Sequence, residues 1–170
     1  GAYVEGARAT KQGTVAAKTL ESRQDALGLW YLGMARYYSS FEVVNSDAAT
    51  KLAQSITRLM RGIESFQASA KANSSYADSC RQWMAMCQAA QGYLTLDAKD
   101  YPTAQKFFLA AAATATDRIT AAVYGTYTVK NGIEFIVDHY YRQQKDLPAA
   151  IKTLQAACVV ITNDAGLSNN

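Results

Sequence analysis

The chain has 170 residues, of which 49% are hydrophobic and 18% charged, and it carries a formal net charge of +3. This composition is typical of a folded domain and excludes a fully disordered chain. The charge is too small for a nucleic-acid-binding surface, and no apolar stretch approaches the roughly 18 residues that a membrane-spanning helix needs. Residues 1–170 are therefore expected to form a single domain with no nucleic-acid partner and no transmembrane segment; peripheral membrane contact is compatible with the sequence.

Alanine is abundant whereas proline occurs only twice. This combination favours helices, because alanine loses no side-chain entropy in a helix and proline removes a backbone donor. No segment has the alternating apolar and polar pattern of a half-buried strand. The sequence thus predicts an all-α fold of about six antiparallel helices.

The N-terminal half predicts two helices after a loose leader at residues 1–13, which contains three glycines. The first helix spans residues 14–44, where apolar residues recur at helical spacing. The Asn45-Ser46-Asp47 turn is expected to supply the cap of the second helix, which runs to Ala72, because a side-chain oxygen there can accept a hydrogen bond from a free amide. The core-facing residues are Leu20, Leu27, Trp30, Met34, Tyr37 and Phe41 in the first helix and Leu52, Ile56, Leu59, Ile63, Phe66 and Ala70 in the second.

The C-terminal half predicts four further helices. Asp100 and Asp146 each stand two residues before a proline, so each is expected to cap a helix with proline in its first turn. Gly125 and the Asn131-Gly132 pair predict a kink in the fifth helix. The expected ranges are 76–98, 100 to a break at 115–117, from that break to 145, and 146–163, followed by a frayed polar tail at 164–170.

One segment of the chain is repeated. Residues 99–111, KDYPTAQKFFLAA, return 46 residues later as KDLPAAIKTLQAA at 145–157. Lysine, aspartate, proline and several alanines match, and Phe108 is answered by Leu154. A repeat of this period is typical of stacked helix pairs, which bind partners more often than they catalyse reactions.

The spacing of apolar residues in both segments resembles the second helix of a tetratricopeptide repeat. There, an aromatic residue is followed by alanine, phenylalanine and alanine at fixed spacing. The period here exceeds the roughly 34 residues of that family, and the first helices lack its full Trp-Leu-Gly-Tyr set. Residues 76–162 carry the resemblance best, and it implies a helical-hairpin array that serves as a protein–protein interaction scaffold. The matching residues are Tyr101, Ala104, Phe108 and Ala111, then Leu147, Ala150, Leu154 and Ala157, with a weaker match at Gly62, Phe66 and Ser69 preceded by Leu29, Leu32 and Gly33.

A second family shares the order of several segments. LWYLGMARYYSS, DAATKLAQSITRLMRGIESFQAS, MAMCQAAQGYL and DLPAAIKTLQAA together resemble the middle of the ALIX-type endosomal-sorting domain, which also has a tetratricopeptide-like core. This resemblance implies a trafficking adaptor with a basic convex surface and an acidic partner. A third alternative is a helical bundle with an internal pocket for a small ligand.

Neither the histidine nor the cysteines form a catalytic or metal-binding pattern. His139 is the only histidine, and no second histidine or cysteine lies three or four positions from it. Cys80, Cys87 and Cys158 are an odd set without a CxxC pair, which predicts reduced, buried thiols and a cytoplasmic location. Phosphate-binding glycine loops, GxSxG and HExxH are absent from the sequence. We therefore expect no enzymatic activity, no cofactor and no metal.

The tyrosines are the strongest indication of a binding surface. The chain has 11 of them, more than a small core needs, and an apolar ring with a polar tip suits a binding groove. We expect a peptide or helix of another protein to bind in a groove built from the first helices of each pair. The expected partner-binding residues are Gln91, Tyr93, Tyr127, Lys130, Tyr140 and Arg142. A basic face that would suit an acidic peptide or phosphates consists of Lys51, Arg58 and Arg61.

Overall fold

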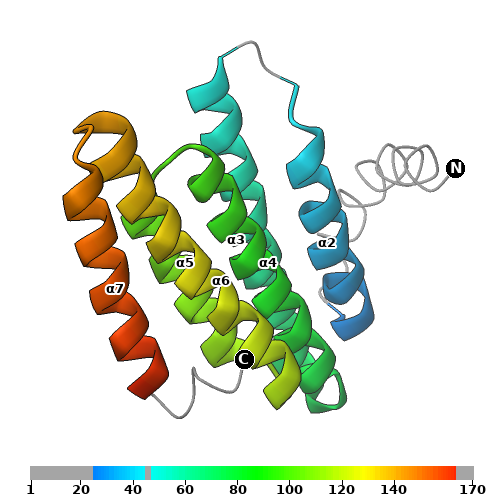
Figure 1. Cartoon of the computed structure of the whole chain (residues 1–170). Helices are drawn as coiled ribbons and strands as arrows, with labels where there is room; N and C mark the ends of the chain where they lie inside the picture. Colours follow the sequence, from blue (N-terminus) through cyan, green and yellow to red (C-terminus); the bar gives the residue numbers. More distant parts are fainter. Residues whose placement is uncertain (1–24, 45–46, 164–170) are drawn as a thin grey trace, which may run out of the picture.

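Six α-helices form an antiparallel array in the computed structural model, which describes residues 25–44 and 47–163. Each helix packs against its neighbours in the chain, so three hairpins lie side by side (Figure 1). The helices are α2 (Ala26–Ser39), α3 (Ala48–Ala72), α4 (Ala77–Asp97), α5 (Tyr101–Thr114), α6 (Arg118–Ile136) and α7 (Leu147–Asn163). The described residues contain no strand. The predicted all-α class with about six helices is confirmed.

Aspartate side chains cap most of these helices by accepting hydrogen bonds from the first free amides. The caps are Asp25 on α2, Asp47 on α3, Asp100 on α5, Asp117 on α6 and Asp146 on α7. The predicted start of the first helix is wrong, because Asp25 has extended backbone and accepts from the amide of Gly28, so α2 begins at Ala26. The expected leader at 1–13, the helical stretch at 14–24 with Leu20, and the tail at 164–170 lie outside the described residues.

The core lies mainly between α3 and α4. Phe66 of α3 is fully buried and stacks on Trp83 of α4, with ring centroids 5.8 Å apart. Cys80 and Cys87 of α4 are also fully buried, as expected of core thiols. Cys158 is exposed, which corrects the expectation that all three thiols are buried. It differs because it lies on α7, at the edge of the array.

Two glycines let the helices of a hairpin approach closely. A Cβ atom on Gly33 of α2 would lie 2.6 Å from the ring of Phe66 in α3. A Cβ atom on Gly92 of α4 would lie 2.6 Å from the ring of Phe108 in α5. Any larger residue would displace the ring, so these glycines fix how tightly the first two hairpins close.

The α6–α7 hairpin departs from the prediction. Helix α6 runs through Gly125 and Gly132 as one α-helix, so these glycines do not split it. The irregularity lies later, where the α-helix becomes a π-helical segment at Val137–Gln143. Helix α7 approaches this segment and only a short part of α6. Consequently several large apolar residues of α6 remain exposed, including Ile119 at 78%.

The two matching segments adopt the same local structure. Lys99 and Lys145 both have left-handed backbone, with φ of 62° and 57°. Each precedes a capping aspartate, and Ala104 and Ala150 are both buried. The sequence match therefore extends to the backbone at the start of α5 and α7.

Candidate functional site

Tyrosine and tryptophan rings of three helices gather in two groups that share α4, and together we call them the aromatic face. Its residues are Tyr37 and Tyr38 of α2, Trp83 and Tyr93 of α4, and Tyr124 and Tyr127 of α6. Contacts between the rings join the helices: Trp83 lies 5.5 Å from Tyr37 and 6.1 Å from Tyr38, measured between ring centroids. Tyr93 and Tyr127 lie 5.0 Å apart.

The centre of this surface rests on the tight α4–α5 packing. Because Gly92 has no side chain, Phe108 sits against α4 and its ring reaches both tyrosines above it. Its centroid lies 5.3 Å from that of Tyr93 and 5.8 Å from that of Tyr127. Tyr124 of α6 lies beside Tyr127 on the same helix, with ring centroids 6.1 Å apart. The rings are thus held by core packing rather than by loops.

Three hydroxyls of the aromatic face, those of Tyr37, Tyr93 and Tyr124, are neutral at physiological pH because their pKa values are raised. Burial is the main cause that raises the pKa of Tyr37 to about 12. Burial likewise raises the pKa of Tyr93, to which a hydrogen bond with Tyr127 adds, and the pKa of Tyr124. A neutral phenol both donates and accepts hydrogen bonds. The surface therefore offers apolar rings with uncharged polar tips, a combination suited to peptide contacts.

The predicted partner-binding residues divide into two groups in the structure. Tyr93, which is 40% exposed, and Tyr127 are brought together in the aromatic face, and Lys130 is exposed one turn further along α6. Gln91 is only 1% exposed, so its side chain is not on the surface. Its burial follows from helix geometry, because a residue two positions from Tyr93 points to another side of α4.

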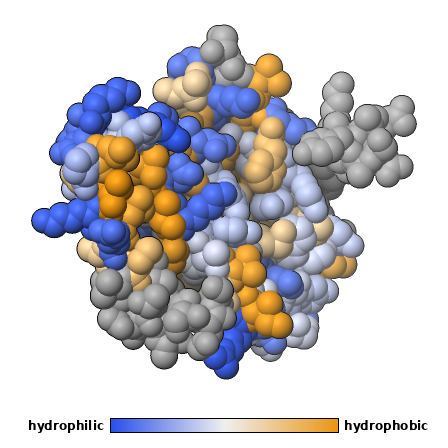
Figure 2. Space-filling model, viewed as in Figure 1, coloured by the Kyte–Doolittle hydropathy of each residue, from blue (hydrophilic) through white to orange (hydrophobic). Residues whose placement is uncertain are grey.

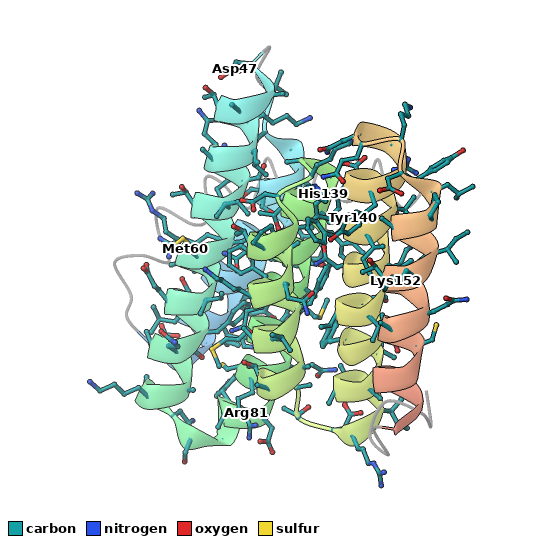
Figure 3. All side chains as sticks on the ribbon, turned by 60° about the vertical axis from the view of Figure 1, so that its left-hand side comes forward. Asp47, Met60, Arg81, His139, Tyr140 and Lys152 are labelled. Atoms are coloured by element: carbon teal, nitrogen blue, oxygen red, sulfur yellow. The ribbon has the colours of Figure 1, made fainter. Side chains whose placement is uncertain are left out.

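Tyr140 and Arg142 belong to the π-helical segment instead. Tyr140 packs edge-on against His139, with ring centroids 4.9 Å apart (Figure 3). His139 in turn stacks on Phe135 of α6. A π-helical turn is rare and is often found at functional sites. This one exposes Arg142 while it buries a neighbouring carboxylate, Asp138.

Asp138 forms a buried charge cluster that the sequence reasoning missed. Its side chain is 2% exposed and accepts hydrogen bonds from Lys99 Nζ at 3.2 Å and Gln143 Nε2 at 2.9 Å; Arg142 lies at 3.5 Å. Burial opposes its ionisation, but the bonds from Lys99 and Gln143 outweigh burial and lower the pKa of Asp138. Asp138 follows Gly92 by 46 residues, the period of the repeat. The signal in the sequence is therefore a carboxylate at the position where the other hairpin has a glycine.

A small cavity of about 200 Å³ lies between α5 and α6. It is lined by Tyr101, Pro102, Gln105, Asn131, Gly132 and Phe135. Asn131 Nδ2 donates to the Tyr101 carbonyl at 3.0 Å and to Gln105 Oε1 at 2.9 Å. Because that carbonyl can only accept, it fixes the orientation of the Asn131 amide, whose Oδ1 is buried without a hydrogen-bond partner among the described residues. The cavity is smaller than typical cofactor sites, which span about 300–1,000 Å³.

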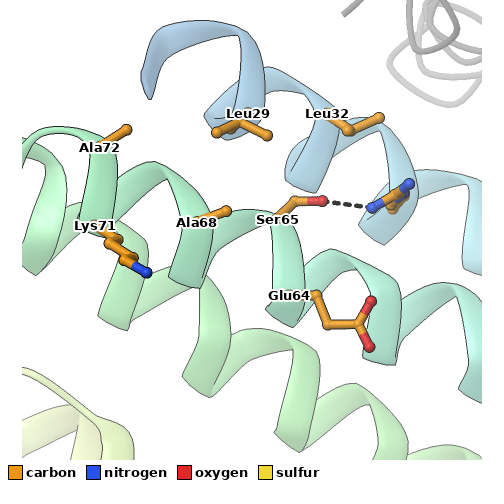
Figure 4. Close-up of a pocket in the computed structure, with 8 residues that line it drawn as sticks. Leu29, Leu32, Glu64, Ser65, Ala68, Lys71 and Ala72 are labelled. Atoms are coloured by element: carbon orange, nitrogen blue, oxygen red, sulfur yellow. Dashed lines mark hydrogen bonds between the residues drawn. The ribbon is translucent and has the colours of Figure 1, made fainter. Parts of the chain in front are cut away.

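A larger depression of about 590 Å³ lies between α2 and α3 (Figure 4). Arg36 crosses its edge and donates to Ser65 Oγ at 2.6 Å and to the Arg61 carbonyl at 3.0 Å. Leu29 and Leu32 supply apolar lining, and Glu64 and Lys71 carry opposite charges at its rim. This mixture of charges does not select one class of ligand.

The predicted basic face is only partly free for a partner. Arg58 donates to the Ser39 carbonyl at 2.6 Å, at the C-terminal end of α2, where a cation stabilises the helix dipole. Lys51 and Arg61 are exposed on α3. Arg58 therefore joins two helices of the fold.

A scan against protein-family models, a search of curated proteins and a search of solved structures each found no match to this chain. Within residues 25–44 and 47–163, no cluster of three or more histidine, cysteine, aspartate or glutamate side chains could hold a metal ion. Over the same ranges, every helix falls short of the length and apolar character needed to cross a bilayer.

Proposed function

We propose that this protein is a non-enzymatic binding module that takes up a peptide or short helix of another protein on its aromatic face. One observation supports this most: α4 carries rings that contact α2 through Trp83 and α6 through Tyr93, so rings of three hairpins are brought together along one helix. Tyr38 and Tyr93 in it are 47% and 40% exposed. Rigid aromatic rings supply contact area at low entropic cost, which is why tyrosine is enriched in interfaces.

The tetratricopeptide-like arrangement is part of this proposal. It is supported by the matching turns at Lys99 and Lys145 and by the tight Gly92–Phe108 crossing. In such an array the first helices of successive pairs, here α2, α4 and α6, line one side. Those are the helices that carry the aromatic face.

The partner is expected to present apolar or aromatic side chains and backbone groups rather than a dense charge. The hydroxyls of Tyr37, Tyr93 and Tyr124 are neutral. Of the predicted partner-binding residues that lie on α6, Lys130 carries the one charge, and it is exposed. The endosomal-sorting alternative depends on a basic face, and the use of Arg58 within the fold weakens it.

The test is selection of peptides from a random library on the immobilised full chain, followed by affinity measurement. Tyr93→Ser should weaken the selected peptides at least tenfold, because interface tyrosines often contribute about 1.4 kcal/mol or more. Tyr141→Ser is the matched control, since Tyr141 is 51% exposed but lies in the π-helical segment. Equal loss in both variants, or unchanged binding by Tyr93→Ser, would refute the aromatic face as the site.

A further inference from the structure

The first two turns of α7 carry two large apolar side chains that are exposed within the part of the chain that the structure describes. Leu147 is 50% exposed and Ile151, one turn further, is 47% exposed. Figure 2 shows apolar side chains gathered between hydrophilic ones on the side of the molecule where α7 lies. Large exposed apolar patches on a folded protein commonly mark interaction sites.

The repeat identifies what covers the equivalent face elsewhere in the same molecule. Leu147 and Ile151 follow Tyr101 and Gln105 of α5 by 46 residues. Helix α6 covers those two: Tyr101 is only 9% exposed and contacts the ring of Phe135, at 5.7 Å between centroids. Gln105 accepts a hydrogen bond from α6 at 2.9 Å. An antiparallel helix therefore belongs on the outer face of α7.

The residues of α6 that meet α5 define the spacing such a helix needs. They are Tyr127, Asn131 and Phe135, spaced by four. Position 151 carries isoleucine where α5 has glutamine. A helix on α7 should thus present an apolar or aromatic residue in the place of Asn131.

Helix α2 has this pattern on its own outer side. Leu27, Tyr31 and Ala35 are spaced by four, with an aromatic ring at the central position. Leu27 is 46% exposed and Tyr31 is 50% exposed. Helix α2 is the first helix of its hairpin, and so is α6. Packing of α2 on α7 would therefore repeat the order in which α6 packs on α5.

We propose that α2 of a second molecule packs on α7 of the first, so that the protein assembles head to tail. The contact extends the packing of α6 on α5 and does not depend on the proposed peptide-binding function. Such a contact joins two different surfaces, so one molecule can bind a neighbour at each end. Tyr31 would cover Ile151, and Leu27 and Ala35 would lie on either side of it.

Sedimentation of the full chain over a range of concentrations tests this assembly. The wild type should form dimers and larger species as concentration rises, whereas Ile151→Glu and Tyr31→Glu should each be monomeric. An equimolar mixture of these two variants should form a 1:1 complex of two 18.5 kDa chains and nothing larger, because only one contact remains intact. Ile119→Glu, at a residue 78% exposed outside both faces, is the control and should assemble like the wild type.

Three results would overturn the proposal. They are a monomeric wild type at every concentration, assembly unchanged by either variant, and a mixture of the two variants that stays monomeric. In the second case, a Tyr31→Glu protein that still dimerises while Ile151→Glu does not would point to contact between two α7 helices instead. Circular dichroism checks the fold of each variant. If Ile151→Glu unfolds, Ile151→Gln is used in its place, because glutamine is the residue that α5 has at the matching position. Ile151→Gln should also weaken assembly.

Discussion

The α4–α5 and α6–α7 hairpins contain the same repeated segment but close differently. In α4–α5, Gly92 admits the ring of Phe108, which is fully buried. In α6–α7, the buried carboxylate of Asp138 stands where the period places Gly92, and Leu154, which answers Phe108, is only partly buried. A shared turn and cap therefore specify how the second helix begins, whereas the crossing residues decide how tightly the pair packs.

The largest difference between the two hairpins should appear when their central side chains are truncated. Phe108→Ala should lower the free energy of unfolding by about 3–5 kcal/mol, because it leaves a cavity in a fully buried site. Leu154→Ala should cost clearly less, because its site is partly open to water. Urea denaturation of both variants measures the contrast, and equal losses would show that the two hairpins are packed alike.

The glycines of the two hairpins should respond to alanine with opposite signs. Gly92→Ala should destabilise the protein by about 1–3 kcal/mol, because the new Cβ would meet the Phe108 ring. Gly125→Ala should stabilise it by about 0.5–1 kcal/mol, because nothing lies within 4 Å of its Cβ position and alanine favours the helix. Thermal unfolding reports both, and stabilisation by Gly92→Ala would disprove the close crossing.

The charge cluster at Asp138 should make the α6–α7 hairpin sensitive to acid. Its pKa is lowered in the folded state, so its contribution is complete above the unfolded value of about 4 and is lost as pH falls through the folded value. Asp138→Asn should therefore flatten the fall in unfolding free energy below pH 4. Identical pH curves for Asp138→Asn and the wild type would show that the Asp138 cluster does not contribute to the acid sensitivity.

The smallest effect on stability should come from the two lysines with left-handed backbone, Lys99 and Lys145. Lys145→Gly should raise stability by up to about 1 kcal/mol, because glycine adopts this backbone without a Cβ penalty. Lys99→Gly should gain less, because it also removes the bond to Asp138 at 3.2 Å. Parallel chemical denaturation separates them, and a larger gain at position 99 would mean that the bond to Asp138 adds nothing.

The sequence was sufficient to predict about six helices and two of their caps, because Asp100 and Asp146 act through local hydrogen bonds. It did not indicate the cap at Asp25, where α2 begins. It was not sufficient to predict which side of a helix faces the core. Gln91, expected at the binding surface, is buried, and Leu27, expected in the core, is 46% exposed. Both outcomes depend on where neighbouring helices lie rather than on local pattern.

Two features of the candidate site also depended on tertiary structure. The π-helical segment at Val137–Gln143 has no distinct sequence signal, and the glycines expected to kink α6 lie in regular helix. The tyrosine count indicated a binding surface, but only packing against Phe108 and Trp83 shows which rings come together.

Amide hydrogen exchange of the full chain at low concentration tests most directly whether one hairpin is closed and the other open. Amides of α4 and α5 should exchange slowest, near the limit set by global unfolding, and those of α7 should exchange much faster because it packs on few neighbours. Equal protection of α5 and α7 under these conditions would contradict the difference between the two hairpins.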